Sequence, residues 1–210
     1  MELNLRDGVF ITGMENEKGL IQASQQGDRQ AFQILVKSCA GKLYNMIYRL
    51  CGNKHSAEDI SQEAFVRAYV KINSFRGDCS FSSWVYSIAI NIWKNGIRSD
   101  IRRKGFLHDS LDETQENEEG ETKAQYADPG EGADTTAEKN CDREKISKAL
   151  MELDEKDRVI IVLRDLQEKS YEEIAAIVKT PCGTVKSRLS RAREALRLKL
   201  IKLKDGEADE

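Results

Sequence analysis

Residues 170–204 read SYEEIAAIVKTPCGTVKSRLSRAREALRLKLIKLK, and this stretch predicts two helices joined by a short turn. Ser170 stands three residues before Glu173, which is the spacing of a reciprocal capping box at a helix start. Thr180 suits an N-cap and Pro181 suits the first position of a new helix. With a turn of about four residues between them, the two helices have the spacing of a helix-turn-helix unit.

The second helix, expected over residues 184–203, has an apolar face and a basic face. Its apolar side chains recur at helical spacing and predict a stripe packed on the preceding helices. They are Val185, Leu189, Ala192 and Leu196. Over residues 183–204, eight basic residues stand against one acidic residue. A basic helix alone is typical of any solvated surface, but behind a capped helix and a short turn it favours DNA binding.

Charge is divided along the chain, which has 210 residues and a net charge of -3. Residues 106–144 contain thirteen acidic and three basic residues and few large apolar ones. Such a segment cannot bury enough surface to offset the entropy cost of ordering it. We therefore expect a flexible acidic linker there, between domains at 17–105 and 145–204, with tails at 1–16 and 205–210.

The residue types predict neither an enzyme nor a cofactor. Five cysteines lie far apart, without a CxxC pair and with only two histidines, so no metal site or disulfide framework is supported. Reduced thiols in the cytosol are the default. Clustered carboxylates and a phosphate-binding glycine loop are missing as well, which disfavours an enzyme that acts on nucleic acid. Residues 1–13 predict neither a signal peptide nor a membrane span, and Met14 is a second candidate start.

Helical periodicity dominates residues 17–103, where proline is absent, and predicts an all-helical domain. A capped start at Ser56 and Asp59 opens a helix. Its inward face repeats every four residues as Ile60, Ala64, Ala68 and Ile72. Asp59, Gln62 and Glu63 fall on the other side. Acidic residues in a first turn stabilise a helix through its dipole, so this face indicates either a stabilised helix start or a partner surface.

A loop bracketed by aromatic residues follows, over residues 74–84, and leads into a helix with a basic end. Aromatic rings are more often core, but they also stack on unpaired bases, while basic side chains follow the sugar–phosphate backbone. The combination suits a site for single-stranded DNA or a flipped base. The candidate residues are Phe75, Arg76, Phe81, Trp84, Asn91, Arg98, Arg102 and Arg103.

Five ordered blocks of the chain resemble the extracytoplasmic-function (ECF) sigma factors of bacterial RNA polymerase, in the sigma-E-like branch. The blocks are GDRQAF at 27–32, AEDISQEAF at 57–65, SFRGD at 74–78, residues 84–91, and LRDL at 163–166 with SYEEIA at 170–175 and GTVKSR at 183–188. Asn95 and Asp154 depart from the common Asp and Pro at their positions. The resemblance covers nearly everything outside the tail and the linker.

The resemblance implies an all-α fold of two small helical domains, a region 2 bundle and a region 4 helix-turn-helix. It implies a non-enzymatic promoter-specificity subunit that binds core polymerase through Asp59, Gln62 and Glu63. The loop around Phe75 and Asn91 would hold a base of the -10 element. Residues of the last helix would contact the -35 element: Thr184, Lys186, Ser187, Arg188, Ser190, Arg191 and Arg193.

The resemblance also implies partners and a location. The partners would be the two largest polymerase subunits, promoter DNA and an anti-sigma factor, often membrane-bound, and there would be no small-molecule substrate. The chain would be cytoplasmic, or held at the inner face of the membrane by the anti-sigma factor, and would serve a stress or envelope regulon. The other interpretation of the helix-turn-helix is a dimeric repressor or response regulator, which leaves the upstream segments unexplained.

Overall fold

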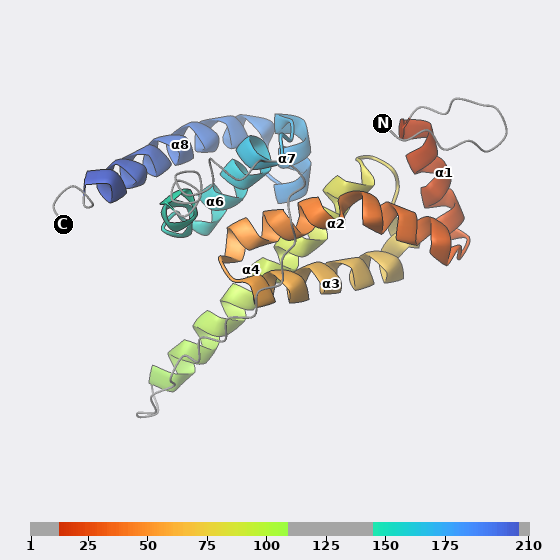
Figure 1. Cartoon of the computed structure of the whole chain (residues 1–210), viewed down its shortest axis with the longest axis horizontal. Helices are drawn as coiled ribbons and strands as arrows, with labels where there is room; N and C mark the ends of the chain where they lie inside the picture. The colour runs from red at the N-terminus through yellow and green to blue at the C-terminus, as the bar shows by residue number, and fades with distance from the viewer. Residues whose placement is uncertain (1–12, 109–144, 206–210) are drawn as a thin grey trace, which may run out of the picture.

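The computed structural model describes residues 13–108 and 145–205, which are almost entirely helical and contain no strand (Figure 1). The first range holds α1 (Gly13–Gln25), α2 (Arg29–Cys51), α3 (Lys54–Lys71), the 3₁₀ turn η1 (Ile72–Ser74) and α4 (Phe81–His108). The second holds a helix over 145–151, α6 (Glu155–Ile161), the π-helical turn η2 (Val162–Leu166), α7 (Tyr171–Val178) and α8 (Cys182–Asp205). The all-α prediction is confirmed. The expected linker falls mainly on residues 109–144, which lie outside the described ranges.

Short polar residues start the helices of the N-terminal domain. The Asp28 carboxylate accepts hydrogen bonds from the backbone N–H groups of Gln30 (2.8 Å) and Ala31 (3.1 Å) and so caps α2. Helix α3 is capped by Asn53, whose side chain accepts from the N–H of Ser56 at 2.9 Å. The predicted start at Ser56 was therefore wrong. Asn53 follows the left-handed Gly52 directly and caps the helix three residues earlier.

Helices α2, α3 and α4 build the core of this domain, and α1 packs against α2. Leu43, Met46 and Ile47 of α2 are completely buried. Ala64 and Ala68 of α3 are completely buried as well. Their small side chains let α2 and α4 approach α3 closely. The predicted inward face of α3 is thus confirmed.

The helix-turn-helix unit forms much as the sequence predicts. Ser170 accepts from the N–H of Glu173 at 3.1 Å, and the Glu173 carboxylate accepts from the N–H of Ser170 at 2.9 Å, which completes the capping box. The second start differs from the prediction, because α8 begins at Cys182 and the Thr180 hydroxyl donates to the Val178 carbonyl (3.3 Å) instead of capping α8. Lys179, in a left-handed conformation with φ of 52°, ends α7 and turns the chain.

The two domains pack against each other. Helix α7 contacts α4, while α6 and η2 contact α2, so the C-terminal domain packs on the N-terminal bundle through these elements (Figure 1). The buried hydrophobic residues of both domains belong to one continuous cluster. Helix α8 runs along the side away from α1, toward the C-terminus (Figure 1).

Candidate nucleic-acid interface

Helix α8 has one packed face and one exposed face. Val185, Leu189 and Ala192 are buried against α6 and α7, as the apolar stripe predicts. The opposite face of the first turns is exposed, and it carries five of the residues predicted to contact the -35 element. These are Thr184, Lys186, Ser187, Ser190 and Arg191. Hydroxyls and long basic side chains are groups that bond base edges and phosphates in a major groove.

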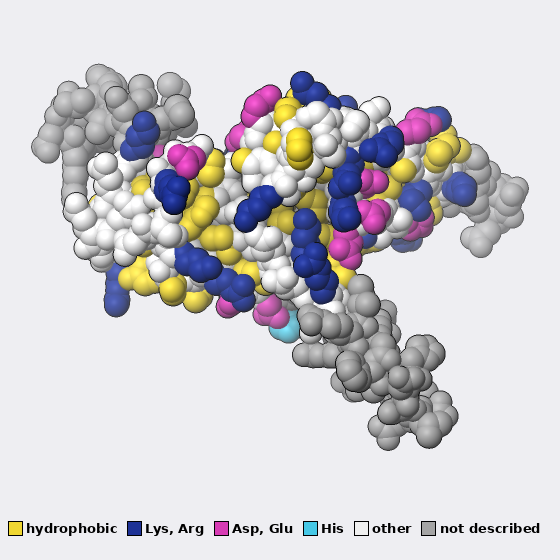
Figure 2. All heavy atoms as spheres, turned by 180° about the vertical axis from the view of Figure 1, so that it is seen from behind, with side chains coloured by type: hydrophobic (Ala, Val, Ile, Leu, Met, Phe, Trp, Pro, Cys, Tyr) yellow, Lys and Arg dark blue, Asp and Glu magenta, His cyan; other side chains and the backbone are white. Residues whose placement is uncertain are grey.

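Several basic side chains of the C-terminal domain already have acidic partners. Arg193 makes a bidentate pair with Asp165, with Nε to Oδ2 at 3.1 Å. Arg188 lies 3.7 Å from Asp157, and a third pair joins Lys199 Nζ to Glu152 at 3.0 Å. Figure 2 shows Lys and Arg side chains interleaved with acidic ones over this half of the molecule. Contacts of Arg188 and Arg193 with phosphate would therefore exchange one charge partner for another.

Tyr171 contacts a residue of the predicted -35 set, and the sequence interpretation did not include it. The Lys186 ammonium lies 5.3 Å from the centroid of its ring, and the Arg164 guanidinium lies 4.8 Å from it. Both distances suit cation–π contacts. The first residue of α7 thus contacts Lys186 of α8, one of the residues predicted to contact the -35 element. No sequence pattern indicated this, because the contact depends on the angle between the two helices.

The predicted aromatic loop over residues 74–84 is shorter in the structure, because Ser74 ends η1 and Phe81 begins α4. Phe75 is 6% exposed and Phe81 is 1% exposed, and their ring centroids are 6.4 Å apart in an edge-to-face arrangement. Trp84, which is partly exposed, lies 4.9 Å from the Phe75 ring. In this structure Phe75 and Phe81 are therefore packed as core rings. The reason is that the Phe81 ring also meets Phe32 of α2 at 5.9 Å.

Polar contacts from α1 fix this loop. Gln25 Nε2 donates to the carbonyls of Ile72 (3.1 Å) and Phe75 (3.0 Å). The Glu17 carboxylate accepts from the N–H of Phe81 at 2.9 Å and supplies an anionic cap to the start of α4. Helix α1 therefore positions the loop, although it carries none of the predicted site residues.

The exposed residues near the loop and along α4 include the polar members of the predicted set. Arg76, Asn91 and Arg98 are exposed. Burial, followed by the nearby Arg98 guanidinium, lowers the pKa of Lys94. The side chains of Arg102 and Arg103, in the last turns of α4, lie outside the described residues.

The outer face of α3 carries the predicted polymerase-binding residues. Asp59 and Gln62 are exposed, and the partly exposed Glu63 accepts from Arg67 Nε at 2.6 Å. Val66 and Val70 continue the same stripe at helical spacing and are 58% and 74% exposed. The outer face of α3 therefore combines polar side chains with two exposed apolar ones.

Within the described ranges, no helix is long and apolar enough to span a membrane, and no group of three or more His, Cys, Asp or Glu residues is placed to hold a metal. These ranges contain a helical bundle with a helix-turn-helix unit packed on it, which is the architecture of a two-part DNA-binding protein.

Comparison with known proteins defines the class further. The family described as Sigma-70 region 2 matches residues 35–103, and Sigma-70, region 4 matches residues 143–196. The chain is 40% identical to ECF RNA polymerase sigma factor SigW of Bacillus subtilis, over 87% of this chain and 96% of that protein. It is 37% identical to the ECF RNA polymerase sigma-E factor of Escherichia coli, over 84% of this chain and 90% of that protein.

Solved structures agree with the sequence relatives. The sigma factor RpoE of Bartonella quintana, in a co-crystal structure with the anti-sigma factor NepR, has a TM-score of 0.62 at 27% identity. That match covers 81% of this chain and 96% of the other. CnrH, in complex with the cytosolic domain of CnrY, shares the fold with a TM-score of 0.64 at 20% identity, over 89% of this chain and 98% of the other. The chain belongs to the ECF sigma factors of the sigma-70 family. It is a promoter-specificity subunit of bacterial RNA polymerase, not an enzyme.

Proposed function

We propose that this chain carries core RNA polymerase to promoters by reading the -35 element with α8 and the -10 element with residues near the 74–84 loop. The observation that carries the proposal is the exposed face of α8, where Lys186, Ser187 and Arg191 lie opposite a buried apolar stripe. A helix held by one face can enter the major groove with the other. Arg193 is assigned to phosphate, because its bidentate pair with Asp165 holds it to one side.

At the -10 element we assign the DNA contacts to the exposed polar residues and the partly exposed Trp84. Arg76, Asn91 and Arg98 offer charge and hydrogen bonds to a single strand, and Trp84 offers part of a ring face. Phe75 and Phe81 support this surface from beneath, because both rings are buried.

The polymerase contact is assigned to the outer face of α3. Asp59, Gln62 and Glu63 supply polar groups, and Val66 and Val70 supply the apolar area that interfaces need at their centre. The assignment rests on these five side chains, four exposed and one partly exposed, on one helix whose other face is buried in the bundle.

The regulatory setting follows from the relatives. RpoE was solved in complex with the anti-sigma factor NepR, and CnrH was solved in complex with the cytosolic domain of CnrY. We propose that this chain is likewise held by an anti-sigma factor, which can be membrane-bound, that it acts in the cytoplasm, and that it serves a stress or envelope regulon.

Run-off transcription with core polymerase on a promoter library tests the function directly. The chain should select a set of promoters with a shared pair of elements that core polymerase alone does not transcribe. Failure to stimulate transcription from any member of the library would refute the proposal.

A second experiment tests the assignment of α3. Asp59→Ala or Gln62→Ala should weaken binding to core polymerase by roughly tenfold, about 1.4 kcal/mol, because each removes a polar contact at the interface. Lys37→Ala, at an exposed position of α2, is the matched control and should bind as the wild type does. Equal affinity for all three variants in a fluorescence binding assay would contradict the assignment.

A further inference from the structure

The last residue of α1 bonds both ends of the turn η1. The Gln25 side-chain amide donates from Nε2 to the carbonyl of Ile72, the first residue of η1, at 3.1 Å. It also donates to the carbonyl of Phe75, which directly follows η1, at 3.0 Å. Both N–H groups of the amide nitrogen are therefore used. One side chain fixes the point at which the chain leaves η1.

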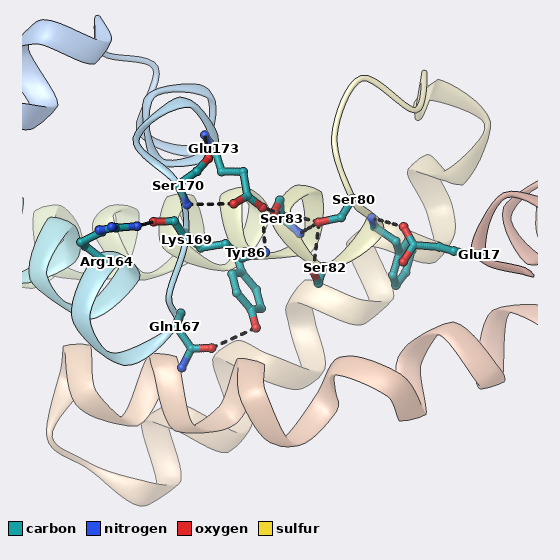
Figure 3. A network of polar contacts seen from close by, with 11 residues as sticks. Glu17, Ser80, Ser82, Ser83, Tyr86, Arg164, Gln167, Lys169, Ser170 and Glu173 are labelled. Carbon is teal, nitrogen blue, oxygen red and sulfur yellow. Dashed lines mark hydrogen bonds and ion pairs between the residues drawn. The ribbon is translucent and has the colours of Figure 1, made fainter. Parts of the chain in front are cut away.

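Glu17, near the other end of α1, holds the start of α4. Its carboxylate accepts from the N–H of Phe81, the first residue of α4, at 2.9 Å. A negative charge at this point is favoured by the dipole of α4. Figure 3 shows the Glu17 side chain directed toward the start of α4, beside Ser80. Two side chains of α1 thus hold the two ends of the segment 76–80.

Helix α1 is itself firmly attached to the bundle. Ile21 of α1 is 8% exposed and belongs to the hydrophobic core. A tight turn joins α1 to α2, in which Gly27 has a left-handed φ of 95° and the N–H of Asp28 donates to the carbonyl of Ala23 at 3.0 Å. Asp28 then caps α2. Helix α1 is therefore a fixed support for the segment that it holds.

The supported segment contains and adjoins residues that are assigned to the -10 strand. Arg76 is exposed within it, next to Gly77, whose φ of 79° suits glycine. Trp84 lies in the first turn of α4, and its ring is 4.9 Å from the ring of Phe75. Phe75 is also the residue whose carbonyl Gln25 holds. The bonds from α1 therefore fix the position of a charge and of a partly exposed ring.

Stability alone does not explain these bonds. Gln25 and Glu17 are both partly exposed, so water can take the place of either side chain. A hydrogen bond that water can replace adds little net free energy to folding. Water does not replace the fixed distance between α1 and the supported segment. The bonds therefore contribute more to the position of the segment than to the stability of the domain.

We infer that Gln25 and Glu17 are positioning residues for base recognition at the -10 element. They hold Arg76 and Trp84 in place before an unpaired base arrives, and they act through these two residues without touching DNA. A segment that is ordered in advance avoids the entropy cost of ordering it on binding. The inference rests on the proposed function, which assigns Arg76 and Trp84 to the -10 strand.

Substitutions at both ends of the segment test the inference. Gln25→Glu keeps the shape of the side chain but removes the N–H donors, so both carbonyls lose their bond. Gln22→Glu is the matched control, because it adds the same charge at an exposed position three residues earlier in α1. Glu17→Ala removes the acceptor at the other end. Glu17→Gln removes the same charge but keeps an oxygen that can accept, so it should restore wild-type behaviour.

The measurement is made with each full-length protein bound to core polymerase. A fluorescent single strand carries the -10 sequence selected from the promoter library, and a series of strands each lacks one base. At one position the wild type should lose about tenfold or more in affinity, as expected for one stacked base. Gln25→Glu and Glu17→Ala should bind the intact strand about tenfold more weakly and lose less than about twofold at that position.

The controls separate positioning from a general loss of structure. Gln22→Glu and Glu17→Gln should follow the wild type on every strand. All four variants should bind core polymerase as the wild type does, because that contact is assigned to α3. Circular dichroism melting checks that each variant is folded, and the pair at position 17 decides the matter if Gln25→Glu is not.

Two results would overturn the inference alone. One is an equal loss at the sensitive position in the wild type and in both Gln25→Glu and Glu17→Ala, because the base would then be recognised without α1. The other is a uniform weakening on all strands with a lowered melting temperature, which would indicate a structural role only. A wild type that distinguishes no base would refute the -10 part of the proposed function, and the positioning role with it.

Discussion

Helix α8 and the segment over residues 74–84 both combine predicted DNA contacts with residues of the core. They divide these two roles differently. On α8 the apolar residues are buried and the basic residues are exposed, as the helical period requires. In the second segment, Phe75 is buried before α4 and Phe81 is buried at the first residue of α4, while Arg76 beside Phe75 is exposed. A regular period therefore tells which side chains face solvent, whereas an irregular loop reveals this only after its neighbours are in place.

The largest expected effect tests the core role of the loop. Phe81→Ala should lower the free energy of unfolding by about 3–5 kcal/mol, because the ring is 1% exposed and meets Phe32 and Phe75. Urea denaturation measures this change. Leu198→Ala, at a position 49% exposed on α8, is the control and should change stability by less than about 1 kcal/mol. If Phe81→Ala were as stable as the wild type but slow to open promoters, the ring would be a base contact after all.

The next effect tests the reading role of α8. Arg191→Ala should lower transcription from a -35-dependent promoter roughly tenfold to a hundredfold. The reason is that it removes one base contact, worth about 1–3 kcal/mol of binding free energy. The unfolding free energy should stay the same, because Arg191 is exposed. Arg197→Ala, which removes an arginine paired with Glu194 further along α8, is the matched control. An equal loss of core-polymerase binding in Arg191→Ala would contradict the division between α3 and α8.

The smallest effect tests how the start of the helix-turn-helix is held. Burial raises the pKa of Glu173, but hydrogen bonds from the Ser170 N–H, Lys169 and Ser83 outweigh it and keep that pKa below its ordinary value of 4.5. The resulting stabilisation is complete above pH about 4.5 and is lost as the pH falls through the lower, folded pKa. Stability should therefore fall more steeply in acid for the wild type than for Glu173→Gln, which keeps the capping geometry.

Glu172→Gln is the control for that comparison, since it removes the same charge from the same first turn. Thermal melts between pH 7 and pH 3 measure the slopes. Parallel curves for the wild type and Glu173→Gln would show that the Glu173 carboxylate contributes nothing specific. The ring contacts among Phe75, Phe81 and Trp84 should not change with pH in this range, because they involve no ionisable group.

Much of the C-terminal unit could be predicted from local sequence. The capping box at Ser170 and Glu173 and the buried stripe through Val185 and Leu189 formed as expected, because each depends on residues within a few turns of one another. The start of α3 could not be predicted from Ser56, because Asn53 is also a suitable N-cap. In the structure Asn53 follows the left-handed Gly52 and caps the helix. The orientation of Lys186 over Tyr171 depended on how two helices cross.

The amino-acid sequence by itself determined that this chain is helical, that α8 is basic on one face, and that α3 carries a polar outer stripe. These are properties of spacing along a single helix, which the helical period fixes. Only the tertiary structure decided that Phe75 and Phe81 are core, that Arg158 of α6 bonds the end of α2, and that Glu173 meets Ser83. Such contacts join residues that are far apart in the chain, and their geometry follows from the packing of whole helices.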